Sequence, residues 1–414
     1  MSTQTVTITR LGAQGHGIAH GADGPIFVPF ALPGETVAIA RVGNQGTVMS
    51  TSVTAPERIA PLCRHFGPEG DACGGCSLQH LADAPYHAFK RQLVVDALKS
   101  KGLEPPVGEL VTAAPRQRRR VVFSVRKTEK ELLLGFNRGE SHTIVSIVEC
   151  PISSDGIIGR LNLIRTAAAA LAQGSETFRL TVTETQSGLD LAAEGFKKIE
   201  DSQRRAVVET VLTLKGVARV SVNGETLVEP QKPQLDFGGV LVSPPPGGFT
   251  QATREAEEAM SALLAGHFAK SKRIIDLFAG SGTFALRLAR HAKVHAVEGD
   301  EKAVATLDQA ARRAQGLKPV TVERRDLFRR PMMPQELKIY DGIVFDPPRA
   351  GAEVQVKEMI RSGVKKIAAV SCNPLTLARD LAILVEAGYR ITSVTPIDQF
   401  LWSSHVEAVA LLEK

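Results

Sequence analysis

Short apolar runs alternate with longer amphipathic stretches from about residue 240 to the end of the chain. A short apolar run predicts a buried strand, and apolar residues three and four positions apart predict a helix. The predicted strands are Arg273–Phe278, Lys293–Glu298, Val320–Arg324, Gly342–Asp346, Lys366–Ser371, Ile391–Pro396 and Val406–Leu412. The predicted helices are Thr283–His291, Glu301–Gln315, Val354–Ser362 and Pro374–Ala387. This order predicts an α/β fold, a Rossmann-like doubly wound sheet of seven strands that ends in an antiparallel hairpin.

The first part of the chain has a different pattern, with short alternating strands between glycine-rich turns. Such strands are expected at Thr5–Ile8, Ile26–Val28 and Thr36–Ala40. They predict a small β-barrel, a shape that often binds RNA, and a purely structural appendage is the alternative. The middle of the chain mixes a helix at Pro85–Lys101, a helix at Ala167–Ala172 and a strand at Phe178–Val182. We therefore expect three domains: the barrel at 1–55, a mixed α+β domain at 58–237 and the α/β domain at 240–414.

Charge suggests a polyanionic partner. The formal net charge is +6, which suits RNA but equally a soluble basic protein. The position of the charges is more informative, because the segment from Arg116 to Lys130 contains seven basic residues and a single acid, Glu129. Alternation in Val121–Val125 predicts that this segment is a strand. We expect a basic strand that faces RNA.

The rest of the sequence bears on location and partners. No apolar run approaches the ~18 residues that span a bilayer. The segment MSTQTVTITR lacks the pattern of a signal peptide. We expect a cytoplasmic protein with no membrane contact, no obligate protein partner and a monomeric state. In a reducing cytosol, clustered cysteines favour metal binding or catalysis over disulfides.

A glycine-rich loop follows the first strand of the α/β domain. Gly280 and Gly282 allow a tight turn before a helix, and Glu298 ends the next strand, where it can accept both ribose hydroxyls of an adenosine ligand. The third glycine of the dinucleotide fingerprint is missing, and Ala285 is the nearest small residue. This disfavours NAD and suits S-adenosylmethionine, which has no phosphate. Asp326, at the end of the third strand, is placed to contact adenine, with a helix N-cap as the alternative.

Two later strand ends carry reactive chemistry. The fourth strand ends in Asp346–Arg349 (DPPR), a motif of methyltransferases that act on exocyclic amines of bases, which does not by itself name the target atom. The fifth ends in Ser371–Pro374 (SCNP), where the Cys372 thiolate can add to an electrophilic carbon. Pyrimidine C5 becomes nucleophilic only after something adds at C6, so Cys372 points to methylation at C5. A buried, inert cysteine is the alternative.

A base is also needed to remove the C5 proton after methyl transfer. Glu407 opens the last strand and can reach the same crevice. His405 is a rival, because residues two apart on a strand share a face and spacing does not separate them.

The other four cysteines form a separate group: Cys63, Cys73, Cys76 and Cys150. The glycines between Cys73 and Cys76 let the backbone wrap a bulky centre, and Pro151 follows Cys150 as in ferredoxin-like ligand runs. Four thiolates suit an iron–sulfur cluster or zinc, and no histidine has a finger-like spacing. We favour a [4Fe–4S] cluster over zinc, with disulfides a remote third.

With these motifs together, nearly the whole chain resembles the bacterial RNA uracil-5-methyltransferases. It is most similar to the 23S rRNA branch, which carries an N-terminal TRAM domain and a [4Fe–4S] cluster. The matching segments are Phe27–Pro29 and Leu32–Glu35 for TRAM; Cys63, Cys73–Cys76 and Cys150–Pro151 for the cluster; Phe249–Gln251, Phe278, Thr283, Glu298 and Asp346 for S-adenosylmethionine; Ser371–Pro374 for the nucleophile; and His405–Glu407 for the base.

Three positions depart from the family pattern. Nine residues separate Cys63 from Cys73 where five are usual. Ala279 replaces a common cysteine, and Thr283 stands where asparagine is usual, which puts its hydrogen bond to the cofactor in question.

The resemblance implies a mechanism and its cofactors. The Cys372 thiolate adds to C6 of a flipped-out uridine, Asp346 holds the uracil edge, and Glu407 removes the C5 proton. The residues implied to hold S-adenosylmethionine are Gln251, Phe278, Gly280, Gly282, Thr283, Glu298, Asp326 and Asp346. The expected substrate is 23S rRNA, with tRNA as the alternative. Cytosine-5 methylation and a non-catalytic RNA-binding or ribosome-assembly factor on the same scaffold also stay open.

Overall fold

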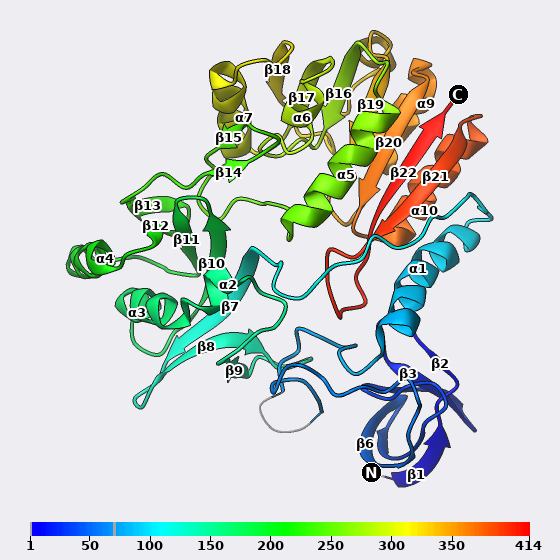
Figure 1. Ribbon diagram of the computed structural model, residues 1–414, viewed down its shortest axis with the longest axis vertical. Helices are drawn as coiled ribbons and strands as arrows, with labels where there is room; N and C mark the ends of the chain where they lie inside the picture. Colours follow the sequence, from blue (N-terminus) through cyan, green and yellow to red (C-terminus); the bar gives the residue numbers. More distant parts are fainter. Residues whose placement is uncertain (1, 69–71) are drawn as a thin grey trace.

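A computed structural model describes residues 2–68 and 72–414 and contains three large sheets (Figure 1). The first sheet has six strands in the order β1-β5-β6-β4-β3-β2 and curls around one apolar core. Its strands are β1 (Ser2–Thr7), β2 (Arg10–Leu11), β3 (Gly17–Gly21), β4 (Gly24–Val28), β5 (Thr36–Val42) and β6 (Gln45–Val53). The three strands expected in this part of the chain are present, because alternate residues such as Val37 and Ile39 point into that core.

The central domain is a seven-stranded sheet with helices packed on the same core. The sheet has the order β13-β12-β11-β10-β7-β8-β9. Its strands are β7 (Arg120–Lys127), β8 (Leu132–Asn137), β9 (Ile144–Ser146), β10 (Thr177–Thr185), β11 (Gly188–Glu194), β12 (Val217–Val222) and β13 (Glu225–Val228). Its helices are α2 (Asp155–Ile158), α3 (Leu161–Leu171) and α4 (Asp201–Thr213). α3 and α4 pack on one apolar core with the sheet.

The C-terminal domain is the doubly wound sheet that the sequence predicts. Its order is β18-β17-β16-β19-β20-β22-β21, and only the β20–β22 and β21–β22 pairs are antiparallel. The strands are β16 (Arg273–Leu277), β17 (Lys293–Glu298), β18 (Val320–Arg324), β19 (Gly342–Phe345), β20 (Lys366–Ser371), β21 (Arg390–Ile397) and β22 (Glu407–Glu413). The helices are α5 (Arg254–His267), α6 (Ala285–Leu288), α7 (Glu301–Arg313), α8 (Pro334–Leu337), α9 (Glu353–Ser362) and α10 (Pro374–Glu386). A two-stranded sheet, β14 (Leu235–Asp236) with β15 (Leu241–Val242), precedes it.

Two predicted helices differ in length. The helix expected at Ala167–Ala172 is part of the longer α3, which covers Leu161–Leu171. The sequence predicts a helix over Thr283–His291, and α6 covers only Ala285–Leu288. Gly282 has a φ of 98°, so the chain cannot be helical there, and after α6 the amides of Arg290 and His291 bond three residues back, which tightens the chain into turns.

Helix α1 (Asp83–Lys99) lies within the expected central range, yet it packs against the C-terminal domain. Figure 1 shows it beside α10 and β21. Val94 and Leu98 of α1 share one apolar core with Val394 of β21. A smaller core, formed by Leu32, Ala55, Leu78, Leu81, Tyr86 and Trp402, joins the barrel, α1 and the loop between β21 and β22. None of the helices in the described ranges is long and apolar enough to cross a bilayer.

Candidate active site

The residues proposed as nucleophile and base lie at one edge of the C-terminal sheet. Cys372 directly follows β20, and Glu407 opens β22, the antiparallel neighbour of β20. Ser371 pairs with Ala408 in this register, so the end of one strand meets the start of the other. The β20–β22 pairing therefore brings together two side chains that are far apart in the sequence.

Glu407 is buried, and a glutamine holds it in place. Gln399 donates a hydrogen bond of 2.8 Å from Nε2 to Oε2 of Glu407, and its Oε1 accepts one of 2.8 Å from the backbone amide of Ala252. Gln399 is itself 3% exposed. Gln399 lies in the β21–β22 loop outside any recognised motif, so no sequence pattern predicted its role.

Burial and mutual repulsion raise the pKa values of three neighbouring carboxyl groups, those of Glu407, Asp346 and Asp276. Burial raises the pKa of Glu407 well above its ordinary value, and the nearby Asp346 raises it further. Burial also raises the pKa of Asp346, while a hydrogen bond of 3.1 Å from Gln251 opposes this shift. Asp276 is fully buried on β16, and burial with Asp346 raises its pKa. A bound cation would relieve this repulsion, and the sulfonium of S-adenosylmethionine is one.

Cys372 is half-buried between acidic and basic neighbours. Burial raises the pKa of its thiol, and Glu407 adds to that effect. Arg349 hydrogen-bonds to the thiol and lowers its pKa in opposition. An arginine beside a thiol favours the thiolate, which is the nucleophilic form. The sequence analysis included Arg349 in the DPPR motif but assigned it no role.

His405 and Glu407, which the sequence could not separate, occupy different surroundings. The His405 side chain is exposed, with its ring nitrogens 3.4 Å from Nη2 of Arg349. Glu407 is 3% exposed and interacts with Asp346 and Cys372. The structure thus buries the glutamate beside Asp346 and leaves the histidine exposed.

The glycine-rich loop approaches the crevice as the sequence predicts. Gly280 and Gly282 both have positive φ, and a Cβ on Gly282 would lie 2.3 Å from Leu307, so that position excludes other residues. The amide of Gly280 donates a hydrogen bond of 2.8 Å to Glu298 at the end of β17, and Thr283 is half-buried just after Gly282. The glycine-rich loop and Glu298 therefore belong to the same site.

Phe278 opens this loop with a φ of 62°, an unfavourable value for a bulky residue. Its ring lies 5.4 Å from that of Phe328, which is 48% exposed. Such strain is typical of functional sites. The exposed Phe328, which the sequence analysis did not single out, extends the apolar wall beside Phe278.

The Asp326 side chain accepts hydrogen bonds from the backbone amides that follow it, as an N-cap residue does. Its Oδ1 accepts hydrogen bonds from the amides of Phe328 (3.0 Å) and Arg329 (3.3 Å). Its side chain is 51% exposed, and Oδ2 lies 3.5 Å from the Arg329 guanidinium. The structure gives Asp326 a local structural role, and its contact with adenine stays a prediction.

Gln251 is held by an arginine from the central domain. Arg119 donates from Nε to the Gln251 carbonyl (3.2 Å) and from Nη2 to Thr250 (3.0 Å), and it also pairs with the buried Glu257 of α5. Arg119 was among the basic residues expected to face RNA. It faces the protein interior instead, where Arg119 and Arg287 of α6 both pair with the buried carboxylate of Glu257.

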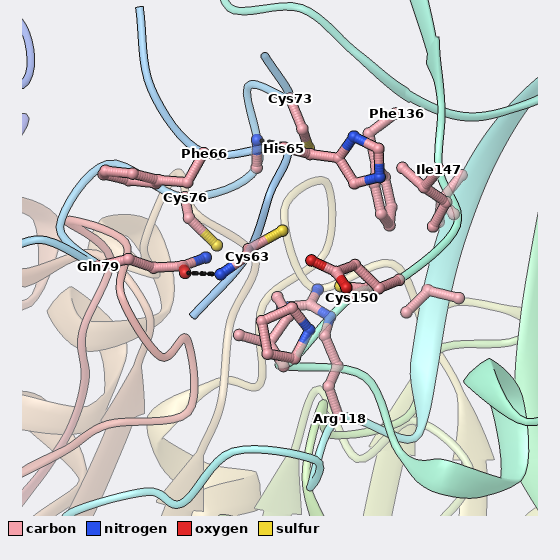
Figure 2. A pocket seen from close by; sticks show the side chains of 16 residues that line it. Cys63, His65, Phe66, Cys73, Cys76, Gln79, Arg118, Phe136, Ile147 and Cys150 are labelled. Atoms are coloured by element: carbon pink, nitrogen blue, oxygen red, sulfur yellow. Dashed lines mark hydrogen bonds between the residues drawn. The ribbon is translucent and has the colours of Figure 1, made fainter. Parts of the chain in front are cut away.

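The four remaining cysteines line one cavity of about 250 Å³ between the segment after the barrel and the central domain. In Figure 2 the sulfurs of Cys63 and Cys76 point toward the space that Cys150 borders, with Arg118 below. The amide of Gly75 donates to the Cys73 sulfur at 3.3 Å, and Ser153 donates to the Cys150 sulfur at 3.2 Å. Polar donors therefore already face these sulfurs.

The geometry of these cysteines differs from that of a single-ion site. Across residues 2–68 and 72–414, no three side chains of the usual ligand types converge on one point closely enough to hold a lone metal ion. A tetrahedral zinc site needs sulfurs ~2.3 Å from one centre. Burial raises the pKa of Cys73 to about 11 and that of Cys76 to about 12, which favours their neutral thiol forms.

The β21–β22 loop that leads to Glu407 is anchored from outside its own domain. Lys90 of α1 is fully buried, pairs with Asp398 at 3.0 Å and donates to the carbonyls of Phe400 (3.1 Å), Ser403 (3.0 Å) and His405. The carbonyl of Trp402 accepts hydrogen bonds from Ser77 (2.9 Å) and Leu78 (3.0 Å), just after Cys76. The N-terminal half of the chain thus fixes the loop that carries the base.

Comparison with known proteins agrees with this geometry. Residues 241–414 match the tRNA (uracil-5-)-methyltransferase family, and residues 1–40 match the TRAM domain. An uncharacterized RNA methyltransferase of Agrobacterium fabrum is 67% identical over all of both chains. The 23S rRNA (uracil(1939)-C(5))-methyltransferase RlmD of Hahella chejuensis is 32% identical over 99% of this chain and 97% of its own. The chain belongs to the RNA uracil-5-methyltransferase family.

A solved structure extends the likeness in fold to nearly the whole molecule. The tRNA (uracil-54, C5)-methyltransferase of Pyrococcus abyssi, in complex with S-adenosyl-L-homocysteine, aligns with a TM-score of 0.74 at 22% identity, over 99% of this chain and 100% of its own. As an RNA uracil-5-methyltransferase, the protein is an S-adenosylmethionine-dependent enzyme that acts on RNA. The Rossmann-like domain and the N-terminal TRAM domain predicted from the sequence are confirmed.

Proposed function

We propose that this protein methylates C5 of a uridine in 23S rRNA, with Cys372 as the nucleophile and Glu407 as the base. The observation that carries the proposal is the pairing of β20 with β22, which brings the thiol beside a buried carboxylate. Methylation of an exocyclic amine would use neither group. The RlmD relative and the TRAM domain support the rRNA target, and tRNA is the second candidate because the Pyrococcus abyssi enzyme acts on tRNA.

Each residue has a distinct role in this proposal. The Cys372 thiolate, favoured by Arg349, forms a bond from sulfur to C6 of uracil and moves an electron pair onto the C5–C4–O4 system. Asp346 holds the uracil edge while C5 takes a methyl group and gains its fourth substituent. Glu407 then removes the C5 proton, and the returning electron pair breaks the bond between sulfur and C6. The products are 5-methyluridine, S-adenosylhomocysteine and the free Cys372 thiolate, with the C5 proton on Glu407.

S-adenosylmethionine supplies the methyl group as a sulfonium. We propose that Gln251, Phe278, Gly280, Gly282, Thr283, Glu298, Asp326 and Asp346 line its site. Glu298 accepts the amides of Gly280, Gly299 and Asp300, which leaves about one lone pair for a ribose hydroxyl. The buried carboxyl groups of Asp276 and Asp346 suit a cation.

We also propose that Cys63, Cys73, Cys76 and Cys150 hold a [4Fe–4S] cluster. The donor set fits, because four cysteines line one cavity and polar donors already face the sulfurs of Cys73 and Cys150. A cluster spreads its ligands over four irons, whereas one zinc ion gathers them tightly. The proposed reaction transfers no electron, so we assign these cysteines a structural role near the β21–β22 loop.

Nucleoside mass spectrometry on separated 23S rRNA and tRNA tests the function. Samples come from a deletion strain that carries an empty plasmid, the wild-type gene or Cys372→Ala. Loss of 5-methyluridine from 23S rRNA, restored by the wild type alone, is the expected result. Loss from tRNA would replace the target while keeping the chemistry. No change in either RNA would overturn the proposal and favour a non-catalytic RNA-binding factor.

A further inference from the structure

A second cavity lies between the barrel and the segment that carries the cysteines. It measures about 330 Å³, and none of the proposed catalytic residues lines it. Phe30, Glu35 and Val48 border it from the barrel, while Arg58, Phe66 and His80 border it from the following segment. A cavity of this size is large enough for one flat heterocycle.

Three aromatic rings surround this cavity. The ring centroids of Phe30 and Phe66 lie 5.2 Å apart at 88°, and those of Phe66 and His80 lie 5.2 Å apart at 35°. Phe30 has a φ of 63°, which is unfavourable for a bulky residue, and Nη2 of Arg58 donates to its carbonyl at 2.7 Å. A strained residue held in this way indicates a ring whose position matters.

His80 is a buried polar group that has no hydrogen-bond partner among residues 2–68 and 72–414. His80 is only 1% exposed, yet neither of its ring nitrogens has a hydrogen-bond partner within the described part of the chain. Buried polar atoms are almost always paired, because an unpaired one costs free energy. Burial, with help from Arg58, lowers the pKa of His80 to about 4, so the ring is neutral and offers one donor and one acceptor.

The charge in this cavity is already balanced. Arg58 donates from Nε and Nη2 to the two oxygens of Glu35, at 2.6 Å and 2.7 Å, and Glu35 is fully buried. The guanidinium is therefore committed and is not free for a phosphate. A neutral cavity with aromatic walls and one donor–acceptor pair suits a nucleobase, which stacks on rings and hydrogen-bonds through its edge.

We propose that this cavity binds a second unstacked nucleobase of the RNA substrate, apart from the uridine that is methylated. The proposal rests on the proposed function for its ligand, and it goes beyond that function by adding a recognition site at the barrel. Gln79, next to His80, accepts the amide of Cys63 at 3.2 Å, so the same short segment supports the cysteine cavity. A base bound here helps to select which RNA loop is presented to Cys372.

A double-mutant cycle between protein and RNA tests this site. The probe is the shortest 23S rRNA or tRNA fragment that the wild type methylates, prepared as a set with one abasic nucleotide at each position. His80→Phe keeps a ring and removes both polar atoms. His20→Phe, at an exposed position of β3, is the matched control. Phe30→Asn is a second variant, since asparagine tolerates positive φ, and it serves if His80→Phe does not fold.

We expect one abasic position outside the target uridine that weakens binding to the wild type and to His20→Phe about tenfold. The same abasic change should have little effect on His80→Phe or Phe30→Asn, because the site is already lost. Additive losses at every position would overturn the second-base site while methylation by the wild type still supports the proposed function. A wild type that methylates neither RNA overturns the proposed function and this site with it.

Discussion

Gln399 joins Glu407 to the segment that carries Gln251, through hydrogen bonds of 2.8 Å at each end of its side chain. One end holds the proposed base and the other holds the backbone of Ala252. A glutamine can do both because its amide has a donor and an acceptor. The base and a proposed cofactor contact are therefore positioned by the same side chain.

Replacing Gln399 with alanine should shift the pH dependence of methylation. The hydrogen bond favours the ionised Glu407, so its loss raises the pKa of a carboxyl group that burial has already raised. Because the base must be ionised, the acidic limb of kcat against pH should move up by about one pH unit or more. An unmoved limb would show that Glu407 is not the base or that Gln399 does not control it.

Glu407→Gln should trap the enzyme on its RNA. Without a base, the C5 proton stays after methyl transfer, so the bond from sulfur to C6 cannot break. Denaturing gels should show a covalent protein–RNA band that needs S-adenosylmethionine and contains the added methyl group. Cys372→Ala should give no band. A band from Cys372→Ala would remove that thiol from the mechanism.

Arg349 should control the pH at which the enzyme becomes active. It lowers the pKa of both Cys372 and Glu407, and both groups act in their deprotonated forms. In Arg349→Met both pKa values rise, so the single-turnover rate should fall at neutral pH by about tenfold and recover at higher pH. Arg349→Lys should retain part of the effect, and an equal loss at every pH would point to substrate binding instead.

The buried Lys90 should be important for stability and for activity. Lys90→Met leaves Asp398 as an unpaired buried charge, which should cost about 3–5 kcal/mol in the free energy of unfolding. Affinity for S-adenosylhomocysteine should change little, because Lys90 does not contact the glycine-rich loop, while kcat falls. Chemical denaturation and calorimetry measure these quantities, with the exposed Lys99→Met on the same helix as the control. A stability loss without a loss of kcat would mean that the loop keeps its position unaided.

The metal content of purified protein should depend on four cysteines and not on the fifth. Anaerobically prepared wild type should contain iron and sulfide in equal amounts, with visible absorption. Cys76→Ser should lose both, and Cys372→Ser should keep them. Zinc at one ion per chain would reject the iron–sulfur proposal while keeping the ligands, and equal loss in both variants would reject the assignment of ligands.

Local sequence patterns predicted most of the C-terminal domain. The central parallel strands β16, β19 and β20 are buried on both faces, so each appears as a short apolar run. The bounds of β17, β18 and β20 are the predicted ones. The glycine-rich loop was also recognisable, because only glycine fits at Gly282. These features depend on neighbours in the sequence.

Other features depend on contacts between distant parts of the chain. The burial of Arg119 follows from Glu257 on another domain, and the bond from Tyr86 to Asp398 spans 312 residues. The separation of Glu407 from His405 also appears only when β22 is packed. No local pattern encodes such pairs, so the sequence suggested the catalytic groups without showing what holds them.

The anchoring of the β21–β22 loop by Lys90 and Tyr86 has a consequence for how the enzyme folds during its synthesis. Translation delivers the barrel first, then α1 with its lysine, and β22 after every other described strand. During synthesis the RNA-modifying chain can therefore fold its barrel long before the base reaches the thiol. Until Glu407 has emerged, the growing polypeptide cannot complete the methylation of surrounding RNA. The order of the strands therefore delays catalysis until the fold is assembled.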